Sequence, residues 1–326
     1  MSELLIEVHV TRVATEATDI ASYELVRTGG GPLPVFEPGA HIDVHLPGDL
    51  VRQYSLCSPS NDPHRYLIAV LRDPASRGGS VALHDKVAAG DALVISPPRN
   101  HFPLNTGAGH SLLLGGGIGV TPIMCMAERL WRDGASFEFH YCTRTRARTA
   151  FHDALLGADY AARVAIHFDD GADSQRLDIA ATLANRDPST HLYVCGPQGF
   201  MDWVLGAARA QGWPEERIHF EYFGHTVEHS ADDASFEVEL AGTGIVVKVP
   251  ADISITAALK AQGVIVPVSC EQGVCGTCIA RVISGEPDHR DFYLSPREQA
   301  ANDQMLLCCS RAKSPRLVVD LEQASI

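Results

Sequence analysis

Three cysteines lie within nine residues of one another in the segment CEQGVCGTC. Cys270 and Cys275 enclose four residues, and Cys275 and Cys278 enclose two. A fourth thiol, Cys308 or Cys309, follows much later in the chain. A C-x4-C-x2-C pattern with a distant fourth cysteine is the plant-type [2Fe-2S] spacing. The spacing therefore predicts an iron–sulfur cluster, but it does not choose between the two late cysteines.

Two glycines in the same segment fit a loop around a cluster. Gly273 and Gly276 have no Cβ atom, so the backbone can wrap closely and direct its N–H groups at cluster sulfurs. A tetrahedral zinc site also takes four thiolates, usually from two paired C-x2-4-C knuckles, and only one such pair precedes the late thiol. We expect a [2Fe-2S] cluster, with structural zinc as the alternative.

A glycine-rich loop, LLLGGGIGVTPIM, lies between an apolar run and a helical pattern. Gly115, Gly116 and Gly117 precede the start of the expected helix, where backbone N–H groups and the helix dipole favour a pyrophosphate. Val120 stands at the last glycine position of the G-x-G-x-x-G fingerprint. Taken alone, the loop is also consistent with a tight turn in any α/β protein.

Two segments nearer the N-terminus carry further candidate residues. RQYSLCS begins at Arg52 and, by itself, is only an alternating strand. RGGSVALHD places Gly78, Gly79 and Ser80 at an expected helix start, which is a second anion-binding geometry.

The elements around these motifs fall into successive regions. Residues 1–105 contain short alternating stretches broken by Gly and Pro clusters, which predicts an antiparallel sheet closed as a barrel or sandwich. Residues 106–226 alternate strands with helices, which predicts a parallel sheet with binding loops at the carboxyl ends of its strands. Residues 227–234 are polar and acidic, so we expect a linker. Residues 235–326 begin with a hairpin and a helix and then carry the cysteine segment.

Composition and charge exclude several classes of function. The 326 residues, 45% of them hydrophobic, are enough for two or three domains with their own cores. A net charge of −14 gives no electrostatic reason to gather on nucleic acid or anionic membranes. The chain starts without a secretion-signal pattern, has no apolar run long enough to span a membrane, and has an odd number of cysteines. We therefore expect a cytoplasmic protein that binds neither nucleic acid nor membranes.

The C-terminal region, from residue 234 onward, resembles a plant-type ferredoxin domain, and this implies a β-grasp fold. In that family the last ligand lies in a run like MLLCCSR, where the first cysteine aligns with the ligand position. The resemblance therefore implies that Cys308 is the fourth ligand and that Cys309 is a packing thiol.

The middle region resembles the nucleotide domain of the ferredoxin–NADP reductase superfamily. The resemblance rests on the G-G-x-G-x-T-P loop together with the later segment YVCGPQGFM. It implies that Gly117 and Thr121 help to hold the dinucleotide, and that Cys195, Gly196 and Pro197 lie beside the nicotinamide. A neutral thiol at Cys195 could orient the reacting ring, because hydride transfer depends on alignment. The alternative for this residue is a buried structural thiol.

The first region carries the flavin signature R-x-Y-S of the same superfamily. By this resemblance Arg52 pairs with the flavin phosphate, Tyr54 packs on the isoalloxazine ring and Ser55 faces its N5 edge. The expected helix start at Gly79 and Ser80 agrees with this resemblance, because its anion-binding geometry suits a flavin phosphate. Phe223 falls where an aromatic residue often covers the flavin ring, although a core phenylalanine is the alternative.

The order of the three regions resembles the phthalate dioxygenase reductase group over essentially the whole chain. In that group a ferredoxin module placed after the nucleotide domain accompanies FMN. The resemblance thus implies an enzyme that passes electrons from NADH through FMN and a [2Fe-2S] cluster to the terminal oxygenase of a Rieske-type system.

Several alternatives stay open at this level. FAD with another electron acceptor is one, and a non-enzymatic redox sensor is another. NADPH is also possible, because the three arginines of RTRAR could bind a 2′-phosphate, whereas Asp169 and Asp170 favour the ribose hydroxyl of NADH.

Overall fold

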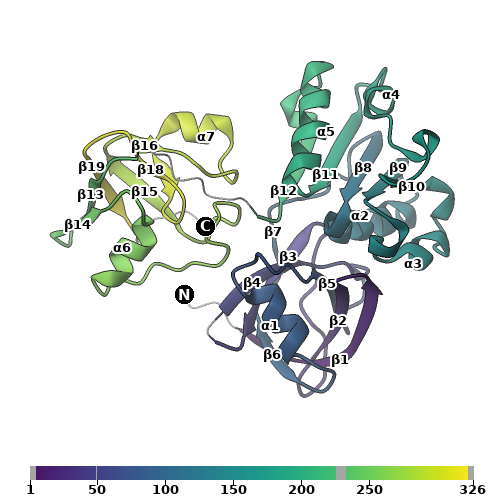
Figure 1. The fold of residues 1–326 in the computed structure, drawn as a ribbon, viewed down its shortest axis with the longest axis horizontal. Helices are drawn as coiled ribbons and strands as arrows, with labels where there is room; N and C mark the ends of the chain where they lie inside the picture. The colour runs from purple at the N-terminus through teal and green to yellow at the C-terminus, as the bar shows by residue number, and fades with distance from the viewer. Residues whose placement is uncertain (1–4, 49, 225–232, 322–326) are drawn as a thin grey trace. The chain divides into compact units, whose positions relative to one another are not determined.

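The computed structural model describes residues 5–48, 50–224 and 233–321 and divides into two compact units, residues 1–223 and 224–326. Figure 1 colours the first unit from purple to green and the second from green to yellow. The first unit contains two sheets, one antiparallel and one parallel, and the second contains a mixed sheet. The first two are the sheet types that the sequence predicted, and the third region carries the sheet of the domain that the resemblance described as a β-grasp fold.

The antiparallel sheet has seven strands in the order β4-β3-β6-β1-β2-β5, with β7 paired to β3. In β1, Ile6, Val8 and Val10 are buried on one face, as the alternating sequence requires. An isolated bridge between Leu56 and Ile68 joins the two ends of the sheet and closes it as a barrel. Its elements are β1 (Ile6–Ala17), β2 (Ile20–Arg27), β3 (Ala40–Leu46), β4 (Leu50–Ser55), β5 (Tyr66–Leu71), α1 (Gly79–Lys86), β6 (Ala92–Ile95) and β7 (Arg99–Asn100).

The parallel sheet has the strand order β10-β9-β8-β11-β12. The chain runs outward from β8 through β9 to β10, then returns to the other side of β8 to form β11 and β12, so the order reverses between β8 and β11. Ligands of open parallel sheets bind at the carboxyl ends of the strands at such a reversal. The strands are β8 (His110–Gly116), β9 (Phe137–Thr143), β10 (Val164–Phe168), β11 (Thr190–Gly196) and β12 (Ile218–Tyr222). The α-helices are α2 (Val120–Arg132), α3 (His152–Leu156), α4 (Ile179–Leu183) and α5 (Gln198–Ala210), and the 3-10 turns are η1 (Gly117–Gly119), η2 (Arg146–Arg148), η3 (Ala161–Arg163), η4 (Asp173–Gln175) and η5 (Glu215–Arg217).

The second unit has a five-stranded sheet in the order β14-β13-β19-β15-β17 and a small pair, β16-β18. The expected hairpin and helix are present as β13, β14 and α6, and Ser254 caps α6 by accepting a hydrogen bond from the amide of Ala257. The elements are β13 (Phe236–Leu240), β14 (Ile245–Val249), α6 (Ile255–Ala261), β15 (Ile279–Ser284), β16 (Pro287–Asp288), α7 (Pro296–Ala301), β17 (Gln304–Leu306), β18 (Arg311–Ala312) and β19 (Arg316–Asp320).

The predicted domain limits at residues 105 and 226 stay predictions, because both predicted N-terminal domains lie within one unit. Most of the predicted linker, residues 227–232, lies outside the described residues. Within the described part of the chain, no helix combines the length and the apolar character needed to cross a membrane.

Candidate functional site

The cysteine segment brings its thiols together in the interior of the second unit. Cys270 and Cys275 have sulfurs within hydrogen-bonding distance of each other, and so do Cys278 and Cys308. The sulfurs of Cys270 and Cys308 are also within hydrogen-bonding distance of each other, so the two pairs are adjacent. All four side chains are buried. The structure thus gathers the four predicted ligands from a loop and from a segment thirty residues later.

The loop offers these sulfurs backbone donors. The Gln272 amide donates to Cys270 Sγ at 3.3 Å, and the Gly273 amide donates to the sulfur of Cys308. Gly273 and Gly276 have φ angles of +73° and +75°, and a Cβ at Gly276 would collide with the ring of Tyr293. Buried thiolates that accept backbone N–H bonds are typical ligands of an iron–sulfur cluster, so these residues fit the group.

The pairing of the thiols also bears on the zinc alternative. The sulfurs lie in two pairs, Cys270–Cys275 and Cys278–Cys308, and two thiolates for each iron are what a [2Fe-2S] centre requires. The hydrogen bond from Cys270 is the largest cause that lowers the pKa of Cys275, to about 6, which favours its thiolate form.

Cys309 has different surroundings from Cys308. Its sulfur lies at 3.8 Å from both the Leu306 carbonyl and the Ser310 hydroxyl, and it packs directly beneath Gly273. The sulfur of Cys308 approaches those of Cys270 and Cys278, whereas the sulfur of Cys309 approaches that of Cys308, and this favours Cys308 as the ligand and Cys309 as a packing residue.

In the first unit, Arg52 lies against the start of α1. Its Nη2 donates to the Arg77 carbonyl at 2.9 Å, and a Cβ at Gly79 would collide with its side chain. Gly78, at the helix start, has a φ of +84° and provides no side-chain cap. The arginine of RQYS and the glycines of RGGS, which were separate signals in the sequence, therefore meet at a helix N-terminus suited to a phosphate.

The neighbouring flavin candidates lie on the same barrel. Tyr54 is partly buried against the barrel core, and burial raises the pKa of its hydroxyl. The Ser80 hydroxyl makes hydrogen bonds to nearby residues: it lies 3.0 Å from the Ser76 hydroxyl and accepts from the Asp73 amide at 3.2 Å. Phe223 directly follows β12 and is 39% exposed, so it is not a core residue of the first unit.

A carboxyl group joins the flavin candidate Ser55 to the nicotinamide candidate Cys195. Ser55 Oγ donates to Glu221 Oε2 at 3.4 Å, and Glu221 lies beside Cys195 in the register of β11 and β12. Burial raises the pKa of Glu221 to about 8. Burial, and then the charge of Glu221, raises the pKa of Cys195 well above its usual value, so this thiol stays neutral.

The two glycine segments of the parallel sheet also meet. Gly115 pairs with Cys195 in the register of β8 and β11, and a Cβ at Gly119 would collide with the Cys195 carbonyl. The ring of Phe200 lies over Gly116 and Gly196, because a Cβ at either glycine would meet it at 2.7 Å. Small residues are therefore required where β8 and β11 end.

The remaining nucleotide candidates differ in their exposure and in the space around them. Gly117 has a φ of +53° and open space at its Cβ position, as expected for a loop that accepts a ligand closely. Pro197 is exposed and precedes α5. Thr121 is buried and donates to the Ile118 carbonyl at 3.1 Å, so its hydroxyl shapes the loop.

Two of the arginines considered for a 2′-phosphate are held by carboxylates. Arg146 lies 2.9 Å from Asp153, and Arg148 lies 3.5 Å from Asp19. These ion pairs weaken the case for NADPH.

Glu221 and Phe200 were missed in the sequence analysis. Glu221 is the one acidic residue in the strand IHFEY, and an acidic side chain next to Phe220 and Tyr222 was an available signal. Phe200 belongs to the segment YVCGPQGFM, but nothing in the spacing indicates that its ring covers two glycines.

Comparisons with known proteins agree with this geometry. The family of the 2Fe-2S iron-sulfur cluster binding domain matches residues 238–313. A vanillate O-demethylase oxidoreductase from Pseudomonas sp. (strain HR199 / DSM 7063) is 55% identical over 317 residues, 97% of this chain and 100% of that protein. A tetrachlorobenzoquinone reductase from Sphingobium chlorophenolicum is 42% identical over 319 residues, which are 97% of this chain and 98% of that protein. A solved structure of phthalate dioxygenase reductase matches with a TM-score of 0.76 and 40% sequence identity, over 97% of this chain and 98% of that one. It is described as a modular structure for electron transfer from pyridine nucleotides to [2Fe-2S].

These similarities extend over nearly the whole chain and include all three sheets. They confirm the predicted fold class and the predicted enzyme class, an oxidoreductase for electron transfer. The expected cofactor set, FMN and a [2Fe-2S] cluster with NADH as substrate, agrees with them. The chain belongs to the family of flavin and iron–sulfur reductases that includes vanillate O-demethylase oxidoreductase and phthalate dioxygenase reductase.

Proposed function

We propose that this chain is the reductase component of a Rieske-type oxygenase or demethylase system, and that it transfers electrons from NADH through FMN to a [2Fe-2S] cluster. The observation that carries the proposal is the hydrogen bond between Ser55 and Glu221, because it joins the flavin candidates to the strand that ends beside Cys195. Bound FMN supplies the conversion of a two-electron hydride into single electrons, which a cluster requires.

In this proposal Arg52 and the amides at the start of α1 hold the FMN phosphate. The guanidinium supplies charge-assisted hydrogen bonds, and the helix start supplies N–H groups and a favourable dipole. Tyr54 supports the ring, and Phe223 is exposed enough to cover the ring's other face.

Ser55 and Glu221 hold a proton near the reacting edge of the ring. A carboxyl with a pKa of about 8 is largely protonated at neutral pH, so it adds no negative charge where a hydride arrives. The neutral Cys195 thiol orients the nicotinamide without taking part in proton transfer.

NADH is the proposed nucleotide. Gly117 leaves space for the pyrophosphate, and Gly116 and Gly196 let the ring of Phe200 pack against the ends of β8 and β11 beside it. Arg146 and Arg148 already pair with carboxylates, which leaves less positive charge for a 2′-phosphate.

In the second unit Cys270, Cys275, Cys278 and Cys308 hold the cluster. The proposed acceptor beyond it is a terminal Rieske-type oxygenase, in line with the demethylase and dioxygenase names of relatives. A quinone is the second candidate acceptor, because one relative is named a tetrachlorobenzoquinone reductase. We place the reaction in the cytoplasm, where NADH is available and the nine free cysteines stay reduced.

The test begins with the purified holoenzyme. Released flavin should be FMN, iron and acid-labile sulfide should be present in equal amounts, and NADH should reduce the protein with a higher kcat/KM than NADPH. A Cys308→Ser variant should keep NADH-driven ferricyanide reduction and lose reduction of the oxygenase.

NADH oxidation that depends on an oxygenase and its substrate supports the oxygenase as the acceptor, whereas efficient turnover with a quinone alone supports a quinone. Protein without bound flavin, or without labile sulfide, would contradict the proposal.

A further inference from the structure

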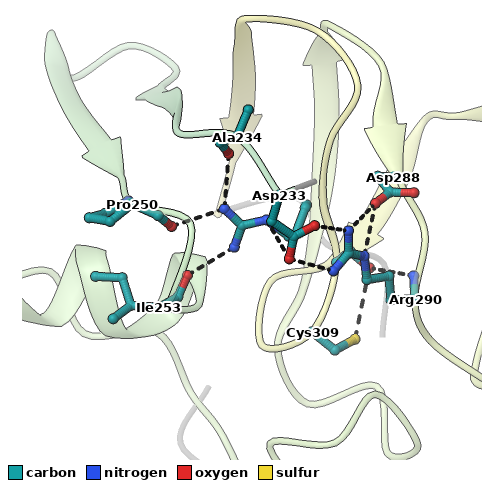
Figure 2. Close-up of polar contacts among 9 residues, drawn as sticks. Asp233, Ala234, Pro250, Ile253, Asp288, Arg290 and Cys309 are labelled. Atoms are coloured by element: carbon teal, nitrogen blue, oxygen red, sulfur yellow. Dashed lines mark hydrogen bonds and ion pairs between the residues drawn. The ribbon is translucent and has the colours of Figure 1, made fainter. Parts of the chain in front are cut away.

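A buried ion-pair network lies where the described part of the second unit resumes at Asp233 (Figure 2). The side chain of Asp233 is only 4% exposed. Its two carboxylate oxygens accept from both terminal nitrogens of Arg290, at 2.5 and 3.0 Å, and Arg311 Nε lies 3.7 Å from Oδ2. Bidentate pairs of this kind hold both partners in one orientation.

Arg311 is fixed from several directions besides Asp233. Its guanidinium donates to the carbonyls of Pro250, Ile253 and Ala234 at 2.9, 3.1 and 3.2 Å. Its side chain is 5% exposed. The arginine therefore binds the backbone of Ala234 as well as the side chain of Asp233, and both residues are held at the surface of the sheet.

The network is built on the segments that carry the cluster ligands. Arg311 follows Cys308 by three residues, and the Arg290 amide donates to the Ser310 hydroxyl at 3.4 Å. Figure 2 shows Cys309 beside Arg290. Asp233 is consequently attached to the region of the unit in which the cluster would be held.

We propose that Asp233 is a positioning residue for internal electron transfer, because it fixes the point at which the peptide from the first unit is attached to the cluster-binding unit. This inference rests on the proposed function. With the attachment at Asp233, ten Cα–Cα steps lead to it from Phe223, the last residue of the first unit; without it, thirteen steps lead to Phe236 at the start of β13. The maximum span then rises from about 36 Å to about 47 Å.

A longer tether lowers the effective concentration of one unit at the other, roughly as the −3/2 power of its length. A nine-residue Gly-Ser insertion upstream of Asp233, after Gly224, should therefore slow electron transfer from flavin to cluster by about 2.6-fold. The same insertion downstream, between Ser235 and Phe236, should leave the rate unchanged, because the attachment at Asp233 isolates it from the tether.

The experiment measures flavin reduction and then cluster reduction after NADH is mixed with the holoenzyme. Asp233→Asn removes the charge that faces both Arg290 and Arg311, so the Ala234 carbonyl should be released from Arg311 as well, and the downstream insertion should then slow cluster reduction by about 2.2-fold. Glu286→Gln is the matched control, because it removes the carboxylate of a surface ion pair with Lys313 in the same unit. If the upstream and downstream insertions slow cluster reduction equally in the protein that retains Asp233, the proposal is wrong.

Hydrogen exchange supplies a readout that does not depend on turnover. Asp233→Asn should lose protection at the Glu237 amide near the start of β13, which donates to the Pro315 carbonyl at 3.0 Å, and keep it in β15 and the cysteine segment. Unchanged protection at Glu237, or loss throughout the unit, would refute a positioning role. If NADH fails to reduce the native cluster, the proposed function fails, and the exchange result still decides whether Asp233 is an attachment point.

Discussion

Ser55 and Glu221 are 166 residues apart in the sequence, and Ser55 Oγ donates a hydrogen bond to Glu221 Oε2 at 3.4 Å. The bond joins the last residue of β4 in the barrel to β12 of the parallel sheet. It places a protonatable group between the proposed flavin and nicotinamide positions.

We expect flavin reduction by NADH to slow as the pH rises through about 8, the pKa of Glu221. Ionisation would place a negative charge beside the position that receives a hydride. Glu221→Gln should remove this pH dependence and stay close to the native rate at neutral pH, and Glu221→Ala should be slower by roughly fivefold through loss of the hydrogen bond. Stopped-flow traces between pH 6 and 9 test this, and a native rate that rises with pH would contradict it.

The same residue should make the stability of the first unit depend on pH. The folded-state pKa of about 8 is above the ordinary value of 4.5, so between these values the folded state keeps a proton that the unfolded state releases. Stability therefore falls as pH rises through this window. Glu221→Gln should melt at a higher temperature than the native protein at pH 9 and at a similar temperature at pH 5. Equal melting temperatures at pH 9 would refute the raised pKa.

Flavin affinity should depend on the contact between Arg52 and Gly79. Arg52→Ala removes charge-assisted hydrogen bonds to the proposed phosphate and should weaken FMN binding by roughly 10- to 100-fold. Gly79→Ala should also weaken it, because the added Cβ would displace the arginine side chain. Arg72→Ala, which removes an exposed arginine paired with Asp85 at 3.2 Å, is the control and should bind FMN normally. Fluorescence titration of the flavin-free protein measures the affinity, and normal binding by Arg52→Ala would exclude the proposed phosphate site.

Gly119→Ala should raise the KM for NADH by about tenfold or more, since the added Cβ would separate η1 from the end of β11 at Cys195. Gly206→Ala provides a control in α5, where a Cβ would meet nothing within 4 Å. Steady-state ferricyanide reduction gives both kinetic constants. An unchanged KM in Gly119→Ala would show that this packing does not support the nucleotide site.

Cys308→Ser and Cys309→Ser should behave differently although the residues are adjacent. Loss of a ligand should abolish the visible absorption of the cluster and the labile sulfide in Cys308→Ser. Cys309→Ser should retain both, because Cys309 packs beneath Gly273 and near the Leu306 carbonyl. The opposite result would reassign the fourth ligand.

Local sequence patterns predict a site well where its chemistry depends on residues that are neighbours in the chain. The spacing of Cys270, Cys275 and Cys278 and the glycines before Thr121 are local patterns, so they could be read directly. Glu221 could not be identified this way, because its partner Ser55 belongs to a different sheet. Asp233 could not be identified for another reason. Its neighbours in the sequence are polar and resemble a linker, and Arg290 and Arg311 come close to it only in the folded unit.

The parallel pairing of β13 with β19 has a consequence for fusion proteins. Glu237 near the start of β13 lies opposite Arg316 at the start of β19, so both strands run toward the same edge of the sheet. Strands of five residues are about 16 Å long. A domain fused directly after Asp320, the last residue of β19, would therefore start at the end of the sheet opposite Glu237 and Arg316.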